Sequence, residues 1–254
     1  MKTTRTITLA LAASLLLTAG CAEDEADGPS TPEAPKTAGD HGLSKVLFLG
    51  DSVAAGQAKP LAAALKASGV GFRSEAADGG GNVVGPFADK GWKTLPDRIA
   101  SAKPSVVVYQ LTTYDWGSAK EQQAGYRRLV TTATATGAKV LFVTMPPIRP
   151  DDFYRPHMAE LDRAPAAARA VAADSWGKAD VLDAAAVWGS TYRQTRDGKA
   201  DRSADGIHTC PQGAARFTGW LLDELAKQYR GFAPASGEDW ANTGWSADKR
   251  FKGC

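Results

Sequence analysis

Short apolar runs with no alternation of polar residues recur along the chain from residue 43 onward. They are strongest at residues 45–50, 105–111 and 139–145, and weaker at residues 70–76 and 179–183. Uninterrupted apolar runs of this length are typical of strands that are buried on both faces, as in a parallel sheet. We therefore predict five strands at these positions.

Segments with helical character separate these runs. The predicted helices are at residues 53–68, 94–102, 119–136, 153–176 and 211–229, and residues 78–85 are predicted to form a glycine-rich loop. Pro60, Pro156 and Pro165 predict kinks or interruptions, whereas Pro211 begins the last helix, where its missing N–H costs nothing. Repeated β-α units of this kind predict an α/β fold, with a parallel central sheet and helices on both of its faces.

The first 20 residues are typical of an export signal. Lys2 and Arg5 precede an apolar stretch at residues 7–17, which is too short to span a bilayer because a membrane helix needs about 20 apolar residues. The small residues directly before Cys21 resemble the lipobox of bacterial lipoproteins, although Thr18 stands where that pattern prefers Leu. This predicts an extracytoplasmic lipoprotein that is anchored to the cell membrane through Cys21, with plain secretion as the alternative.

The segment that follows the export signal is predicted to be a tether. Residues 22–42 are acidic, rich in Pro, Gly, Ser and Thr, and lack large apolar side chains. Such a segment cannot bury a core, so we predict a lipidated, disordered tether at residues 21–42, in which His41 has no role. Residues 43–254 are long enough for one domain with a C-terminal tail.

The charge of the chain argues against a nucleic-acid partner. The chain has 30 Lys and Arg against 28 Asp and Glu, and loss of Lys2 and Arg5 with the signal leaves 28 of each. The sequence has no basic stripe and no run of interleaved Arg and aromatic residues.

The cysteine count fits an exported protein. If Cys21 carries a lipid, Cys210 and Cys254 remain, and an oxidising compartment favours a disulfide between them. The alternative is two unrelated thiols.

Three residues have the chemistry for acyl transfer. Ser52 ends the sequence Gly50-Asp51-Ser52 between the first strand and its helix, where its own N–H can stabilise an oxyanion; the alternative is that these residues only cap the helix. Asp205 lies three residues before His208, so its carboxylate can accept from Nδ1 and leave Nε2 free to take a proton from Ser52.

Other features near these residues narrow the choice of family. The serine is not in a Gly-x-Ser-x-Gly elbow, because Ala54 stands where the second glycine should be. His157 lies in a polar segment and is assigned to the surface.

Residues 46–52 together with residues 205–208 resemble the SGNH, or GDSL, hydrolase family, and the similarity covers residues 43 to about 229. The resemblance implies a flavodoxin-like three-layer α/β/α sandwich and a serine esterase or related acyl-transferring enzyme, with no metal or other cofactor. It also implies that Ser52 is the nucleophile and that Asp205 and His208 share one late loop.

The resemblance implies an oxyanion hole made by the serine N–H, a glycine N–H after the second strand and an Asn side chain after the third. For the glycine we favour Gly79 among residues 79–81. The Asn is missing, because Tyr114 stands in its place. Other possible donors are Asn82, Gln110 and Thr113. The possible substrate contacts are Asn82, Thr113, Tyr114 and Trp116.

These observations predict a monomeric serine esterase that acts on acyl groups of cell-envelope glycans or on small esters. The alternatives are a glycan O-acyltransferase, which would form the same covalent intermediate, and a glycan-binding lipoprotein with weak catalysis, which the loss of the Asn favours. Trp240 and Trp245 in the C-terminal segment are predicted to anchor the tail, with a sugar-stacking surface as the alternative.

Overall fold

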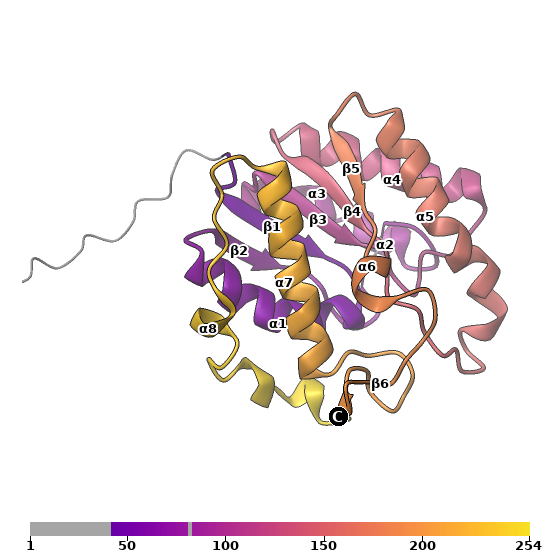
Figure 1. Cartoon of the computed structure of the whole chain (residues 1–254). Helices are drawn as coiled ribbons and strands as arrows, with labels where there is room; N and C mark the ends of the chain where they lie inside the picture. Colours follow the sequence, from indigo (N-terminus) through magenta and orange to yellow (C-terminus); the bar gives the residue numbers. More distant parts are fainter. Residues whose placement is uncertain (1–41, 81–82) are drawn as a thin grey trace, which may run out of the picture. The chain divides into compact units, whose positions relative to one another are not determined.

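Five parallel strands form one sheet in the computed structural model, which describes residues 42–80 and 83–254. The strands are β1 (Lys45–Leu49), β2 (Gly71–Ser74), β3 (Val106–Gln110), β4 (Lys139–Val143) and β5 (Ala179–Leu182). Their order is β2-β1-β3-β4-β5, which is the order of flavodoxin-like sheets (Figure 1). The predicted parallel sheet is therefore confirmed.

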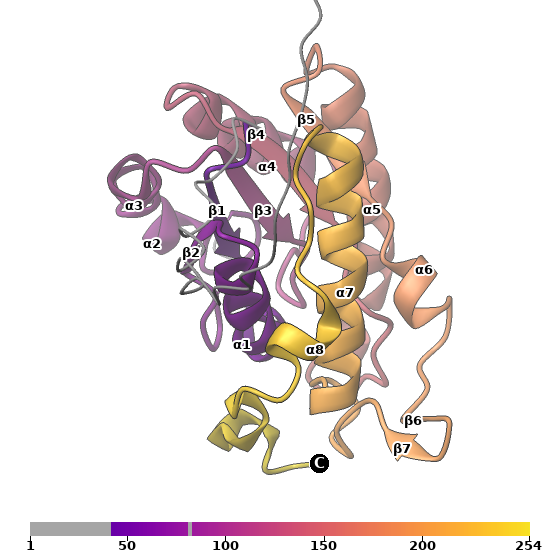
Figure 2. The same ribbon diagram turned by 60° about the vertical axis from the view of Figure 1, so that its left-hand side comes forward.

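Helices cover both faces of the sheet. The longer helices are α1 (Ser52–Ala67), α3 (Leu95–Ala102), α4 (Ala119–Thr134), α5 (Met158–Ala173) and α7 (Pro211–Gln228). The shorter ones are α2 (Ala88–Trp92), α6 (Ala185–Trp188) and α8 (Gly237–Trp240), and a two-stranded hairpin joins β6 (Thr195–Arg196) to β7 (Lys199–Ala200). Helices α1 and α7 lie on one face, and α3, α4 and α5 lie on the other, so the three-layer α/β/α sandwich is confirmed (Figures 1 and 2).

The central strands β1, β3 and β4 each supply side chains to two separate cores. Val46 and Phe48 of β1 pack with residues of α1 and α7, whereas Leu47 and Leu49 pack with residues of α3, α4 and α5. Successive side chains of a strand point to opposite faces, so an uninterrupted apolar strand fills both layers.

The prolines interrupt the helices less than predicted. Pro60 lies inside α1 and Pro165 inside α5, and both helices continue through them. A proline in a helix removes one backbone hydrogen bond, and the surrounding turns and tertiary packing can hold the helix together. Pro156 lies in a short 3-10 turn (Arg155–His157) directly before α5, so it marks where that helix begins.

The C-terminal tail packs back against the domain. Trp240 is buried, and the Trp245 indole N–H donates to the Trp240 carbonyl at 3.0 Å. The Trp245 ring also lies edge-on to Phe251, with ring centres 5.9 Å apart. A disulfide joins Cys254 to Cys210, as predicted. The two tryptophans therefore anchor the tail.

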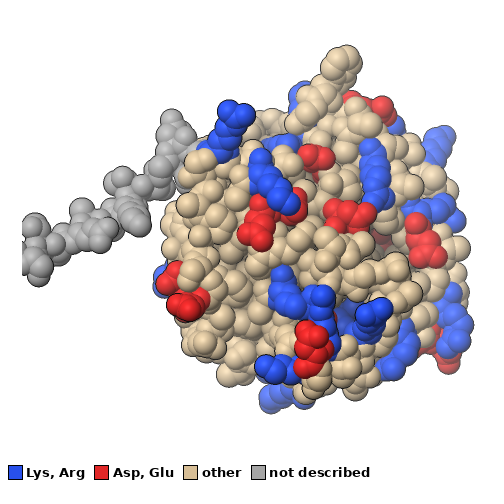
Figure 3. All heavy atoms as spheres, viewed as in Figure 1, with Lys and Arg blue, Asp and Glu red and all other residues tan. Residues whose placement is uncertain are grey.

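The predicted signal peptide, the lipidation site Cys21, most of the tether and Asn82 lie outside the described residues. Among the helices of residues 42–80 and 83–254, none combines the length and the apolar character needed to cross a bilayer. On the face drawn in Figure 3, acidic and basic side chains lie interspersed.

Candidate active site

Ser52 is the first residue of α1, directly after a tight turn at the carboxyl end of β1. The turn needs a glycine at position 50, because a Cβ there would lie 2.4 Å from the Cβ of Ala54. Asp51 is the helix cap, since its Oδ1 accepts from the Val53 N–H at 3.0 Å. The capping role therefore belongs to Asp51, and the Ser52 hydroxyl stays free for other partners.

A Ser-His-Asp relay joins the first helix to the loop before α7. The Oγ of Ser52 lies 2.8 Å from Nε2 of His208, and Nδ1 of His208 lies 2.7 Å from Oδ2 of Asp205. This arrangement leaves Nε2 to accept the serine proton while the carboxylate fixes the tautomer. Ser52 and His208, with a sequence separation of 156, thus meet at one edge of the sheet.

The loop that carries Asp205 and His208, here called the histidine loop, is shaped by the same Asp205 carboxylate that orients the His208 ring. Oδ1 of Asp205 accepts from the backbone N–H groups of Ile207 at 2.7 Å and His208 at 3.0 Å. Burial acts to raise the pKa of Asp205, but the hydrogen bonds from the His208 ring and these two N–H groups outweigh it and lower the pKa to about 2. Gly206, between Asp205 and Ile207, has φ +86°, and a Cβ there would lie 2.8 Å from the Arg149 carbonyl oxygen. This position of the loop therefore needs a glycine.

A pocket of about 540 Å³ opens over the relay. Ser52, His208 and Gly79 all line it. The N–H of Gly80 donates to the Ala77 carbonyl at 2.8 Å, so it is occupied, whereas the structure shows no such partner for the Gly79 N–H among the described residues. Of the two candidates that the structure describes, Gly79 is therefore better placed than Gly80 to hold an oxyanion beside the Ser52 N–H, and Gly81 lies outside the described residues.

Comparison with known proteins decides the family. A family model described as an SGNH domain fused to AT3 domains matches residues 20–217, which is most of the chain. The chain belongs to the SGNH family. Family membership and the Ser52-His208-Asp205 geometry together make this SGNH protein a serine ester hydrolase. No curated protein sequence matches the chain significantly.

Solved structures share the SGNH fold of this chain. A carbohydrate esterase family 3 protein from Talaromyces cellulolyticus aligns with a TM-score of 0.53 and 18% identity, over 73% of this chain and 98% of that one. A GDSL-like lipase from Bacteroides thetaiotaomicron aligns with a TM-score of 0.53 and 13% identity, over 73% of this chain and 89% of the lipase. A mutant of an acetyl-xylooligosaccharide esterase from Geobacillus Stearmophilus aligns with a TM-score of 0.52 and 15% identity, over 72% of this chain and 94% of the esterase.

Two candidate oxyanion donors of this SGNH site are buried and already engaged. The hydroxyl and the N–H of Thr113 both donate to Oδ2 of Asp51, each at 2.8 Å. The side-chain amide of Gln110 donates to Oε1 of Gln57 at 2.7 Å. Neither side chain reaches the pocket, so their assignment as donors or substrate contacts is corrected.

Tyr114, which stands in place of the SGNH asparagine, does line the pocket. Its hydroxyl is 3.3 Å from that of Tyr154, a second pocket residue, and its ring lies edge-on to Phe87 and Tyr154. Burial, followed by the hydrogen bond to Tyr154, raises the pKa of Tyr114 above its ordinary value. Tyr114 therefore forms an aromatic wall of the pocket.

Trp116 lies behind Tyr114 and does not line the triad pocket, which corrects its assignment as a substrate contact. Its indole N–H donates to the Thr113 carbonyl at 2.8 Å, and its ring stacks on His157 with centres 3.5 Å apart. His157 is also paired with Glu160 at 2.7 Å and is half-buried. The side chain of His157 is 31% exposed, in agreement with the surface assignment, and its ring is held in the stack on Trp116.

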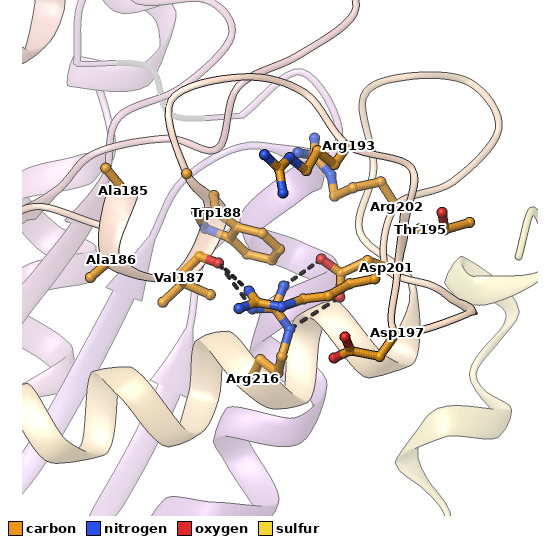
Figure 4. Close-up of a pocket in the computed structure, with 12 residues that line it drawn as sticks. Ala185, Ala186, Val187, Trp188, Arg193, Thr195, Asp197, Asp201, Arg202 and Arg216 are labelled. Atoms are coloured by element: carbon orange, nitrogen blue, oxygen red, sulfur yellow. Dashed lines mark hydrogen bonds and ion pairs between the residues drawn. The ribbon is translucent and has the colours of Figure 1, made fainter.

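A second pocket, of about 520 Å³, is lined among others by Trp188, Asp201, Arg202 and Arg216 (Figure 4). Arg202, which is 2% exposed, donates from there to the carbonyls of Pro147 at 2.7 Å, Ile207 at 2.6 Å and His208 at 3.3 Å. Its guanidinium lies 5.5 Å from the centre of the Trp188 ring. Arg202 therefore supports the backbone on both sides of the catalytic ring.

Another buried group supports the loop after β3. Asp115 is fully buried and accepts from the hydroxyls of Tyr109 at 2.6 Å, Thr112 at 2.8 Å and Tyr126 at 2.8 Å. Burial raises the pKa of Asp115 to about 6 although these hydrogen bonds oppose it. Sequence reasoning assigned no role to Asp115 or Arg202, because the sequence does not show that these charged side chains are buried.

Proposed function

We propose that the protein cleaves carboxylic esters through an acyl-enzyme on Ser52. The Oγ of Ser52 attacks the ester carbonyl carbon and passes its proton to Nε2 of His208. The resulting oxyanion accepts from the N–H groups of Ser52 and Gly79. The carbonyl–oxygen bond to the alcohol then breaks, and His208 returns the proton to the leaving alcohol. A water molecule then attacks the acyl-enzyme while His208 takes its proton. The bond to Oγ of Ser52 breaks, His208 returns the proton to Ser52, and the carboxylic acid is released.

The relay geometry carries this proposal. The 2.8 Å distance from Oγ of Ser52 to Nε2 of His208 allows direct proton transfer between them, and the 2.7 Å hydrogen bond between Nδ1 of His208 and Asp205 orients the ring. The helix N-terminus adds a favourable electrostatic field at the nucleophile, since Ser52 is the first residue of α1. We propose a short acyl group, because the aromatic wall of Tyr114 and Tyr154 limits the pocket beside the serine.

We further propose acetylated glycans of the cell envelope as the natural substrates. Two of the structures with this fold are named as a carbohydrate esterase and an acetyl-xylooligosaccharide esterase. The export signal and the lipobox-like residues before Cys21 would place a monomeric lipoprotein next to such glycans.

Hydrolysis of aryl esters tests the reaction. We expect Ser52→Ala to abolish hydrolysis of aryl acetate, and the exposed Ser190→Ala to leave it unchanged. Intact-mass measurement should show an acetyl adduct on the wild type and none on Ser52→Ala. Equal rates for the wild type and Ser52→Ala would refute the proposal. An added sugar acceptor that gains the acetyl group would assign the enzyme to transfer.

Membrane attachment is tested separately. Cys21→Ser is expected to release the protein from the membrane fraction. Retention of that variant in the membrane would refute lipid anchoring and would leave the esterase proposal standing.

A further inference from the structure

The last ten residues of the chain return to the active-site pocket. Lys249 and Arg250 line the same pocket as Ser52, Gly79 and His208. The family match ends at residue 217, so the tail at residues 245–254 lies outside the part of the chain that matches the SGNH domain. The two basic side chains thus come from a part of the chain that the family match does not cover.

The tail is attached to two of the elements that build the pocket. Asp248 forms an ion pair with Lys59 of α1, the helix that begins with Ser52, at 2.8 Å. Arg250 donates to Oδ1 of Asp78, the neighbour of Gly79, at 2.6 Å.

A third attachment joins the tail to the segment that carries the catalytic histidine. The disulfide between Cys210 and Cys254 lies two residues beyond His208. The hydroxyl of Ser203 donates to the Gly253 carbonyl at 3.3 Å. The tail is therefore held in a fixed position against α1, against the loop that carries Asp78 and Gly79, and against the histidine loop.

The rim of the pocket carries one cation without an ion-pair partner. Arg250 is paired with Asp78, whereas Asp205 orients the ring of His208, which is neutral when its Nε2 accepts the serine proton. The side chain of Lys249 is exposed, and no carboxylate of the described residues forms an ion pair with it. The hydrogen bond from Arg250 holds the pKa of Asp78 below its ordinary value, and the nearby charge of Lys249 adds to the effect. Lys249 therefore places an unpaired positive charge at the mouth of the pocket, whereas the carboxylate of Asp205 lies on the Nδ1 side of the His208 ring, away from Ser52.

We propose that Lys249 makes the enzyme selective for esters that carry a carboxylate or a phosphate close to the ester group. This inference rests on the proposed esterase function. A cation at the rim attracts an anionic substrate and holds it next to Ser52, whereas a neutral ester gains nothing from it. Among envelope glycans, this chemistry selects acetyl esters of acidic sugars or of phosphate-bearing polymers.

A matched set of aryl acetates tests the selectivity. The probes are phenyl acetate, 4-acetoxybenzoate and 4-acetoxyphenyl phosphate, with each kcat/KM divided by the rate of the same ester with hydroxide. We expect the wild type to favour the two anionic esters by about fivefold at low salt, since a charge pair near the surface is worth about 1 kcal/mol. High salt should reduce this preference.

Variants of the tail separate the rim charge from general effects. The ratio of the normalised kcat/KM for an anionic ester to that for phenyl acetate should fall close to one in Lys249→Gln. In Lys249→Glu the preference should reverse in favour of phenyl acetate. Lys252→Gln is the control, because Lys252 is exposed in the same tail and does not line the pocket. Comparison of the carboxylate and phosphate probes identifies the preferred anion.

The outcomes distinguish the two proposals. Hydrolysis of all three probes with a ratio that Lys249→Gln does not change would overturn the selectivity and leave the esterase function intact. An equal loss of preference in Lys252→Gln would also overturn it, because the effect would then come from the overall charge. Absence of hydrolysis of every probe by the wild type would refute the esterase proposal and the selectivity with it.

Discussion

Asp51 and Thr113 join the ends of two neighbouring strands at the active site. Oδ2 of Asp51 accepts from both the N–H and the hydroxyl of Thr113, each at 2.8 Å, while Oδ1 caps α1. One buried carboxylate therefore fixes the start of the nucleophile helix relative to the loop that carries Tyr114. The position of Ser52 depends on this link.

Thr113→Val should weaken this link without changing the volume of the side chain greatly. The variant removes one of the three donors to a buried carboxylate, which typically costs about 1–3 kcal/mol. We expect a lower urea midpoint and a reduced kcat for aryl acetate. Thr132→Val is the control, because the Thr132 hydroxyl bonds only within its own exposed helix turn. Equal stability of the two variants would contradict the role given to Thr113.

The sequence predicted the strands, the layers and the Asp205–His208 pair because each rests on local information, whereas the role of Ser52 beside them came from the family resemblance. The apolar runs at residues 45–50, 105–111 and 139–145 need burial on both faces, and Asp205 and His208 lie within one turn of each other. Thr113 could not be assigned from the sequence, since a polar residue after a strand can face either the pocket or a buried partner. Its partner Asp51 is 62 residues away.

The residues at the rim of the pocket could not be assigned from the sequence either. Lys249 and Arg250 are ordinary charged residues in the sequence, and only the folded tail brings them beside Ser52. The pairing of Cys210 with Cys254 was predictable from the count of cysteines and the export signal. The contact of Arg250 with Asp78, across 172 residues, was not.

Tyr114 is predicted to shape the pocket and not to stabilise the oxyanion. Its hydroxyl accepts from that of Tyr154 at 3.3 Å and reaches several ångströms further than the asparagine amide it replaces, so Tyr114→Phe should retain kcat within about threefold, far less than the 10²–10³ that loss of an oxyanion donor costs. Tyr114→Ala should raise KM, because it removes the wall of the pocket. A loss of more than a hundredfold in kcat for Tyr114→Phe would instead identify the hydroxyl as the missing donor.

Arg202 is predicted to be a positioning residue for His208. Arg202→Lys keeps the positive charge but cannot supply all the donors that reach Pro147, Ile207 and His208, so a stability loss of about 2–4 kcal/mol is expected. The shifted loop should also lower kcat and change the pH profile of kcat, while KM changes little. Arg193→Lys, in the same pocket, is the control. A loss of stability with an unchanged pH profile would show a structural role alone.

The disulfide between Cys210 and Cys254 should stabilise the whole domain. It closes a loop with a sequence separation of 44 residues, which is worth about 4 kcal/mol in the chain-entropy model. Cys254→Ser is expected to lower the unfolding free energy by up to this amount. Reductant should destabilise the wild type and have no effect on the variant. A wild type that responds to reductant no more than Cys254→Ser would contradict this prediction.

Asp115 should make stability depend on pH. Its pKa of about 6 in the folded protein lies above the ordinary value of 3.8, so the folded state holds the proton more tightly than the unfolded state does. The favourable contribution is therefore fully present below about pH 4 and is lost as the pH rises through about 6. The shift corresponds to at most about 3 kcal/mol.

Asp115→Asn tests this dependence, because the amide cannot titrate. We expect the difference in unfolding free energy between the wild type and Asp115→Asn to move in favour of the variant as the pH rises from 4 to 7. Asp174→Asn is the control, since Asp174 forms an exposed ion pair with Arg127. A difference that stays constant across this range would mean that the hydroxyls of Tyr109, Thr112 and Tyr126 compensate fully for burial, and that Asp115 is ionised throughout.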